Sequence, residues 1–147
     1  MYILGTQTTS TQTVLEGGEI ALGNSYRKYC KKNACGTPVF SLTNTGITLN
    51  WDGVYHITAV FVANGSDAGN IAVQMFENGV AVPSAISTQT ITTPDTEIRT
   101  LNIDYFVLVD STCVLGNNTT VAKTITFENV GVDATFSSVV VNIEKEL

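Results

Sequence analysis

The stretch "GITLNWDGVYHITAVFVA", residues 46–63, predicts two β-strands joined by a tight turn at Asp52-Gly53. In the first strand, apolar residues alternate with polar ones and share one face, at Ile47, Leu49 and Trp51. In the second, residues 53–63, apolar side chains occupy both faces, which indicates a strand that is buried on both sides. A two-layer sandwich can cover only one of those faces with its other sheet. We therefore expect another chain to cover the second face.

Similar patterns extend outward along the chain. Residues 70–77 and 120–129 alternate, whereas residues 97–109 are again apolar on both faces, with Phe106 and Leu108 opposite the main apolar face. No segment shows helical periodicity with capping residues. Many short strands separated by turn residues are typical of an all-β sandwich or barrel.

The sequence "MFENGVAVPSA", residues 75–85, contains a clear turn signal. Asn78-Gly79 favours a two-residue hairpin, because both central residues of such a turn take positive φ. Pro83 cannot donate a ladder hydrogen bond, so we expect the returning strand to lie at a sheet edge or to be broken there.

The composition argues against several classes of function. A chain of 147 residues is long enough for one domain with its own core. Its net charge of -6 disfavours nucleic acid as a partner, because binding phosphates needs clustered Lys and Arg. It has no run of about 18 apolar residues, so we expect no transmembrane helix and no membrane partner. The N-terminus lacks a basic start followed by an apolar stretch, so we also expect no signal peptide.

The basic residues are unevenly placed. Of the seven, four crowd into "YRKYCKKNAC", residues 26–35: Arg27, Lys28, Lys31 and Lys32. Two interpretations stay open at this point. The cluster is either a solvated loop that offsets the acidic remainder or a docking patch for an acidic partner surface.

The three cysteines do not form a metal-binding pattern. A structural zinc site needs four ligands, usually in two close pairs, and Cys30, Cys35, Cys113 and one distant His do not supply them. We expect free thiols in a protein made in the cytoplasm, with a bridge between Cys30 and Cys35 as the alternative.

The N-terminal part differs from the rest. Residues 6–14, "TQTTSTQTV", have little to bury, which predicts either an extended arm that pairs only in an assembly or a disordered terminus. A hairpin is expected next, around Gly17-Gly18. We therefore divide the chain into an arm and hairpin, residues 1–35, which would dock or stabilise a trimer, and a main domain, residues 36–147.

Several of these stretches resemble a known family. "GITLNWDGVYHITAVFVA" resembles the strand pair of tumour necrosis factor-like and complement globular-head jelly rolls, where Gly-x-Tyr, here Gly53-Val54-Tyr55, opens a long central strand. "VQMFENGVAVPSA" (73–85) and "ATFSSVVVNIEKEL" (134–147) resemble bacterial members: the C-terminal domains of collagen-like spore-surface glycoproteins, and phage and prophage proteins of Gram-positive bacteria. The lack of a collagen-like stem favours the phage type. The resemblance implies a two-sheet antiparallel β-sandwich with jelly-roll topology that assembles as a homotrimer.

The resemblance also implies where the trimer contact lies. If Tyr55 faces the core between the sheets, strand alternation sends four residues to the opposite face, where the resembling families make that contact: Val54, His56, Thr58 and Val60. His56 would then meet its symmetry copies near the threefold axis. The alternative is a His hydrogen-bonded inside one subunit.

The sequence carries no pattern of catalytic residues. His56 is the only His and lies mid-strand, and there is no Gly-x-Ser-x-Gly, His-rich metal motif or Gly-rich phosphate loop. Asp67 and Asn70 could supply oxygens to calcium, but we interpret them as a surface turn. We therefore expect no enzyme, no catalytic residue, no cofactor and no metal.

The function expected is a structural, homotrimeric surface module. It would be a phage or prophage virion component, such as a capsid decoration, head fibre or fibre-head protein, made in the host bacterial cytoplasm. Its N-terminal arm would dock on a capsid, tail or surface protein. The alternative is a carbohydrate- or receptor-binding adhesin module at a fibre tip or on a bacterial or spore surface, with a glycan bound by loops 64–70 and 115–120.

Overall fold

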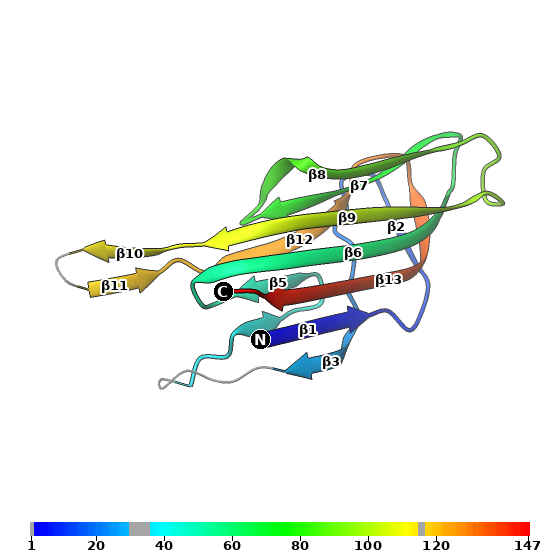
Figure 1. The fold of residues 1–147 in the computed structure, drawn as a ribbon. Coiled ribbons are helices and arrows are strands. Elements are labelled where there is room, and N and C mark those ends of the chain that lie inside the picture. Colours follow the sequence, from blue (N-terminus) through cyan, green and yellow to red (C-terminus); the bar gives the residue numbers. More distant parts are fainter. Residues whose placement is uncertain (1, 30–35, 115–116) are drawn as a thin grey trace.

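The computed structural model describes residues 2–29, 36–114 and 117–147, with the backbone alone for 112–114 and 117–119. The described residues contain no helix and form two antiparallel sheets that face each other (Figure 1). The predicted fold class, an all-β antiparallel sandwich, is confirmed.

Sheet A has the strand order β3-β1-β13-β6-β9, and β2 also pairs with β13. Its strands are β1 (Tyr2–Gln7), β2 (Gln12–Val14), β3 (Asn24–Tyr29), β6 (Gly53–Gly65), β9 (Ile98–Val109) and β13 (Ala134–Lys145). Sheet B has the order β4-β5-β12-β7-β8. Its strands are β4 (Phe40–Leu42), β5 (Gly46–Leu49), β7 (Gly69–Glu77), β8 (Val80–Ile91) and β12 (Lys123–Asn129).

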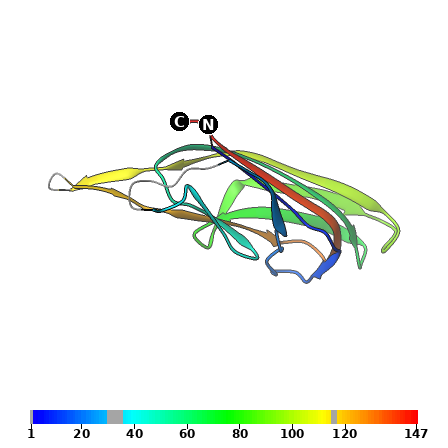
Figure 2. The same ribbon diagram turned by 90° about the horizontal axis from the view of Figure 1, so that it is seen from below.

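A separate hairpin continues from the end of β9. Its strands, β10 (Ser111–Val114) and β11 (Asn117–Thr120), pair only with each other and project beyond one end of the sandwich (Figure 2). The chain termini lie at this same end, where Tyr2 of β1 pairs with Lys145 of β13.

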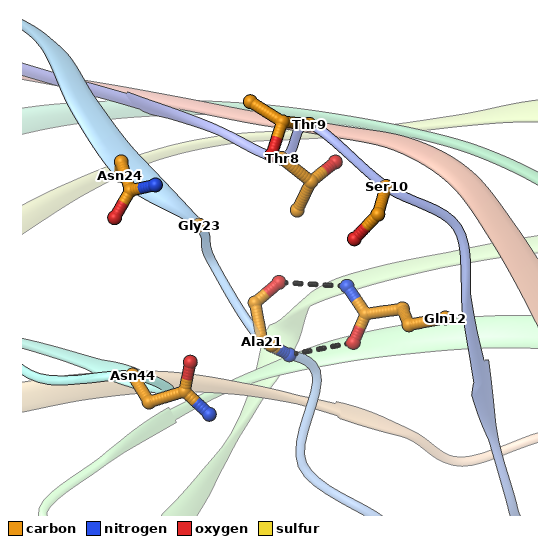
Figure 3. Close-up of a pocket in the computed structure, with 8 residues that line it drawn as sticks. All are labelled: Thr8, Thr9, Ser10, Gln12, Ala21, Gly23, Asn24 and Asn44. Carbon is orange, nitrogen blue, oxygen red and sulfur yellow. Dashed lines mark hydrogen bonds between the residues drawn. The ribbon is translucent and has the colours of Figure 1, made fainter.

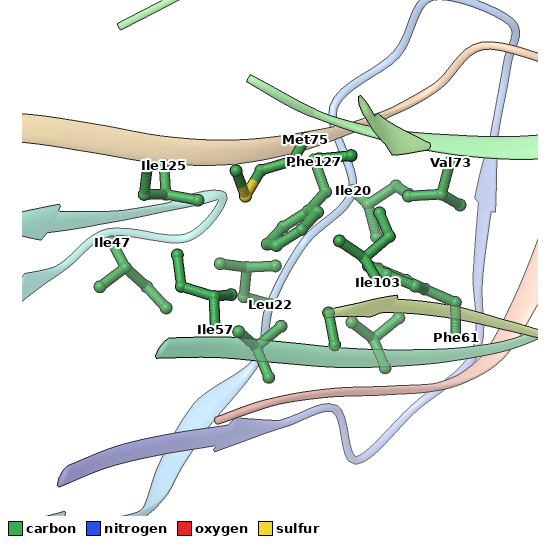
Figure 4. Close-up of a cluster of buried hydrophobic side chains, with 14 of the residues drawn as sticks. Ile20, Leu22, Ile47, Ile57, Phe61, Val73, Met75, Ile103, Ile125 and Phe127 are labelled. Atoms are coloured by element: carbon green, nitrogen blue, oxygen red, sulfur yellow. The ribbon is translucent and has the colours of Figure 1, made fainter. Parts of the chain in front are cut away.

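The core lies between the two sheets. The inward row of β6 includes Tyr55, Ile57 and Phe61, which are fully buried, and Phe61 meets Phe127 of sheet B with ring centroids 5.3 Å apart (Figure 4). The Tyr55 hydroxyl donates to the backbone oxygen of Trp51 at 2.7 Å, and burial raises the pKa of this phenol well above its ordinary value. Tyr55 therefore faces the core, as the family resemblance implied.

The hairpin between β7 and β8 matches its sequence signal. Asn78 and Gly79 have φ of 49° and 78°, and the flanking residues Glu77 and Val80 pair across the turn. Oδ1 of Asn78 also accepts the backbone N–H of Thr124 on β12 at 2.8 Å, which ties the turn to the sheet. Strand β8, which contains Pro83, is the edge of sheet B, so the expectation of an edge strand is confirmed.

The expected N-terminal arm is wrong for residues 2–14. Strand β1 lies inside sheet A, paired with β13 on one side and β3 on the other, and Leu4 and Thr6 are buried. The physical reason is that ladder hydrogen bonds hold the strand on both edges, while Leu4 is buried in the core and Tyr2 packs against it. The segment therefore pairs within its own chain.

The expected hairpin around Gly17-Gly18 is also wrong. A turn is present, with Gly17 at φ 81°, but the strands that flank it do not pair with each other. Strand β2 before the turn pairs with β13 of sheet A, and Glu19 after it forms a bridge to Glu128 of sheet B. The turn therefore carries the chain from one sheet to the other. The buried side chain of Asn129 holds it there, donating to the backbone oxygens of Val14 and Val132, each at 2.9 Å.

Candidate interaction face

The outer face of sheet A, which points away from the core, carries the residues that the sequence singled out. In β6 the residues next to the buried row, Val54, His56, Thr58 and Val60, turn to this face. Their cross-strand partners on β9 are Leu108, Phe106, Asp104 and Asn102. Nothing within the described chain covers these strands on this side, because sheet B lies against the other face.

Large apolar side chains are exposed on this face. The exposed fractions are 64% for Ile98, 58% for Phe106, 51% for Leu108 and 38% for Val60. Three of the four lie on β9, at the edge of the sheet, and only Val60 is among the candidates taken from the resemblance. Phe106 and Leu108 could have been added from the sequence, because their strand is apolar on both faces.

His56 has a partner within its own chain. Its Nε2 lies 2.6 Å from Oδ1 of Asp104, and its ring stacks on Phe106 with centroids 4.5 Å apart and planes inclined by 14°. On the other side, the register pairs His56 with Glu144 of β13. Of the two interpretations left open, the hydrogen bond inside one subunit is therefore present. The cluster also fixes the orientation of Phe106 at the surface.

The predicted basic patch is divided by the limits of the described chain. Arg27 and Lys28 lie on β3, the exposed edge strand of sheet A, and the Arg27 guanidinium lies 6.0 Å from the centre of the Tyr26 ring. Lys31 and Lys32 lie outside the described residues. Cys30 and Cys35 lie outside them too, and only the backbone of Cys113 is described, so the state of the thiols stays a prediction.

The loop predicted for glycan binding, residues 64–70, is tied back to the fold. The Asn64 side chain donates to the backbone oxygen of Asp95 at 3.0 Å, and Oδ1 of Asn70 accepts the Thr90 hydroxyl at 3.0 Å. The second such loop includes residues 115–116, which lie outside the described chain. Among the described residues, no group of three His, Cys, Asp or Glu side chains could hold a metal ion. No described helix is long and apolar enough to cross a membrane.

Comparisons with known proteins identify the type of fold. No protein-family model matches the chain, and no curated protein sequence matches it either. Among solved structures, the globular domain of zebrafish complement 1qA matches with a TM-score of 0.65 at 8% identity, covering 100% of this chain and 98% of that one. Murine APRIL matches with a TM-score of 0.66 at 6% identity, covering 97% and 98%. Vertex protein P5 of PRD1 matches with a TM-score of 0.54 at 17% identity, covering 97% and 93%.

These likenesses support a jelly roll of the tumour necrosis factor and complement globular-head type across nearly the whole chain. In this chain, the exposed apolar side chains lie on the outer face of sheet A, which has β6 in its interior. The fold implied by the sequence resemblance is therefore confirmed.

Proposed function

We propose that this chain is a structural, non-enzymatic module that forms a homotrimer through the outer face of sheet A. The observation that carries the proposal is the group of exposed apolar side chains on that face, Ile98, Phe106, Leu108 and Val60. Several exposed apolar side chains on one sheet face mark an interaction site, because leaving them in water costs free energy. The same strands are the ones whose sequences are apolar on both faces.

A second copy of the chain is the occupant that best fits this face. Closed symmetry is the rule for assemblies of identical chains, and a threefold arrangement would bring three such faces together. The resemblance noted in the sequence implies the same state. The polar cluster of His56 and Asp104 lies within the patch, beside Phe106, and would supply specificity where the apolar side chains supply affinity.

We further propose that the trimer is a component of a phage or prophage virion, as a capsid decoration, head fibre or fibre-head protein. The likeness to vertex protein P5 of PRD1 supports this role, and so does the bacterial and phage character of the sequence resemblance. Strand β1 belongs to the sheet and is not a free docking arm. We therefore assign docking on a capsid or tail protein to the exposed strand β3, which carries Arg27 and Lys28.

Sedimentation velocity tests the assembly. The wild-type chain should sediment as a trimer, and the variant Phe106→Lys/Leu108→Lys should sediment as a folded monomer, because the face would have to bury two charges per chain. The matched control is Val80→Lys/Ile86→Lys, which places the same charges on exposed apolar positions of β8 in sheet B. A monomeric wild type contradicts the proposal, as does a control that dissociates as fully as the test variant.

A further inference from the structure

A polar recess lies at the end of β1 away from the chain termini (Figure 3). Its cavity volume is about 220 Å³. Its walls come from three segments that are distant in sequence: the connection after β1, the entry to β3 and the turn between β4 and β5. The lining residues used below are Thr9, Ser10, Gln12, Gly23, Asn24 and Asn44.

The walls are held in place by hydrogen bonds that do not involve the open groups. The Gln12 amide pairs with both backbone groups of Ala21, through Nε2 to its oxygen at 2.8 Å and from its N–H to Oε1 at 2.9 Å (Figure 3). The N–H of Leu22 donates to the backbone oxygen of Asn44 at 2.9 Å. The N–H of Thr8 donates to the backbone oxygen of Val139 on β13, and the N–H of Val139 donates to Oγ1 of Thr8, each at 3.0 Å.

Gly23 is required at the tightest point of the wall. Its φ is 78°, and a Cβ there would lie 2.1 Å from the backbone oxygen of Gln7. Only glycine allows the two segments to approach this closely. The recess is therefore a preformed feature of the backbone.

The groups that open into the recess are neutral and unpaired. The side chains of Thr9, Ser10, Asn24 and Asn44 make no hydrogen bond within the part of the chain that the structure describes. Each amide offers two donors and an acceptor, and each hydroxyl can act as either. No charged side chain lines the cavity. An anionic ligand would find no cation to pair with, whereas a ligand rich in hydroxyl groups would find both donors and acceptors.

The size restricts the ligand further. Pockets for drug-sized molecules enclose roughly 300–1,000 Å³, so an open recess of about 220 Å³ has room inside it for one small ring. We propose that this recess binds a single neutral sugar residue, free or at the end of a glycan chain. The site is distinct from the outer face of sheet A and from loops 64–70 and 115–120. It is independent of the proposed trimer.

Backbone NMR of the full chain, labelled with ¹⁵N, tests the proposal. The probes are methyl glycosides of glucose, galactose, mannose and N-acetylglucosamine, with methyl glucuronide as a charged counterpart. At least one neutral glycoside should shift the amide signals of residues 8–12, 21–24 and 44, with millimolar affinity, and the glucuronide should bind more weakly. A glycan array then distinguishes a free sugar from a sugar at the end of a glycan chain. If the ligand is a glycan end, the protein should bind the glycans that end in the sugar identified by NMR, and if it is the free sugar, the protein should bind none of them.

Two single variants locate the site. Asn24→Ala and Asn44→Ala should each reduce the affinity several-fold, because each removes hydrogen bonds to ligand hydroxyls, while Gln89→Ala, an exposed amide on β8, should leave it unchanged. Unaltered circular dichroism shows that each variant is folded. The proposal is overturned if no neutral glycoside shifts these signals, if the shifts lie elsewhere, or if both variants bind as the wild type does. None of these outcomes changes the sedimentation result, so the proposed trimer is tested independently of the sugar site.

Discussion

The hydroxyl of Tyr26 on β3 donates to Oδ1 of Asn142 on β13 at 2.6 Å, although β1 lies between the two strands. The ring reaches across because Gly5 of β1 has no side chain. A Cβ at Gly5 would lie 2.8 Å from Oδ1 of Asn142 and 2.8 Å from Cε1 of Tyr26. The bond fastens the exposed edge strand β3, whose residues contribute nothing to the buried core, to the interior of sheet A.

Gly5→Ala should therefore destabilise the protein by displacing Tyr26. We expect the free energy of unfolding to fall by about 0.5–1.5 kcal/mol, the usual worth of one hydrogen bond. Urea denaturation of the wild type, Gly5→Ala and Tyr26→Phe measures this, and the two variants should lose similar amounts.

The effect of Gly5→Ala on the free energy of unfolding should change sign when the Tyr26 ring is absent. On a Tyr26→Ala background Asn142 is free to turn away, and Gly5→Ala should raise the free energy of unfolding by about 0.5 kcal/mol, because alanine loses less backbone entropy than glycine. An equal loss on both backgrounds would mean that the ring over Gly5 is not the cause.

Leu4 should be essential to stability even though it stands three residues from the N-terminus. Its side chain is 1% exposed within the core. Leu4→Ala should cost about 2–5 kcal/mol, as is usual for such a deletion in a packed core. The neighbouring Ile3→Ala, on the outer side of the strand, should cost clearly less. Thermal unfolding of the two variants decides between an integral strand and a dispensable arm, since an arm would leave both midpoints unchanged.

Thr6 is a position where an apolar residue should stabilise the fold. Its Oγ1 is buried without a hydrogen-bond partner among the described residues. Thr6→Val keeps the shape and removes the unpaired hydroxyl, so the free energy of unfolding should rise by about 1 kcal/mol. Thr48→Val is the matched control, because Oγ1 of Thr48 bonds to Oγ1 of Thr124 at 2.9 Å and that variant should lose stability. A loss at Thr6 as well would refute the account.

Glu97 should make the turn between β8 and β9 sensitive to acid. The Thr92 hydroxyl and the Thr93 N–H donate to its Oε1, and Nη2 of Arg99 lies 2.6 Å from Oε2. These contacts, the Thr92 bond first, lower the pKa of the carboxyl below its ordinary value of 4.5. A lowered folded-state pKa contributes stability above the unfolded value, and this contribution is lost as the pH falls through the lowered pKa.

Hydrogen exchange of the Thr93 amide between pH 7 and about pH 3 measures the effect, after correction for the intrinsic exchange rate. Protection in the wild type should decrease on acidification, and Glu97→Gln should show weaker protection with little dependence on pH. Glu146→Gln, an exposed change near the C-terminus, serves as the control and should behave as the wild type. Equal pH profiles for Glu97→Gln and the wild type would contradict the role of the carboxylate.

Local chemistry made much of the fold predictable from the sequence. The alternation along residues 53–63 put Tyr55 and His56 on opposite faces, because successive strand residues point to opposite sides whatever the partner strand is, and the family resemblance assigned Tyr55 to the core, where it is fully buried. Asn78-Gly79 specified its hairpin, since both residues accept positive φ at little cost. The apolar residues on both faces of 97–109 indicated the exposed patch on sheet A. Each of these signals acts within a few residues.

The remainder depends on contacts that only the tertiary structure defines. Strand β1 pairs with β13 across almost the whole chain length, through backbone hydrogen bonds that leave no mark on the side chains, and so the polar residues 6–14 suggested an arm. The partner of His56, Asp104, lies 48 residues away, and becomes its diagonal neighbour only because the register of β6 and β9 places Asp104 opposite Thr58. The polar recess is assembled from three segments that share no pattern. Such features follow from which strands become neighbours, and that choice is made by the free energy of the complete sandwich.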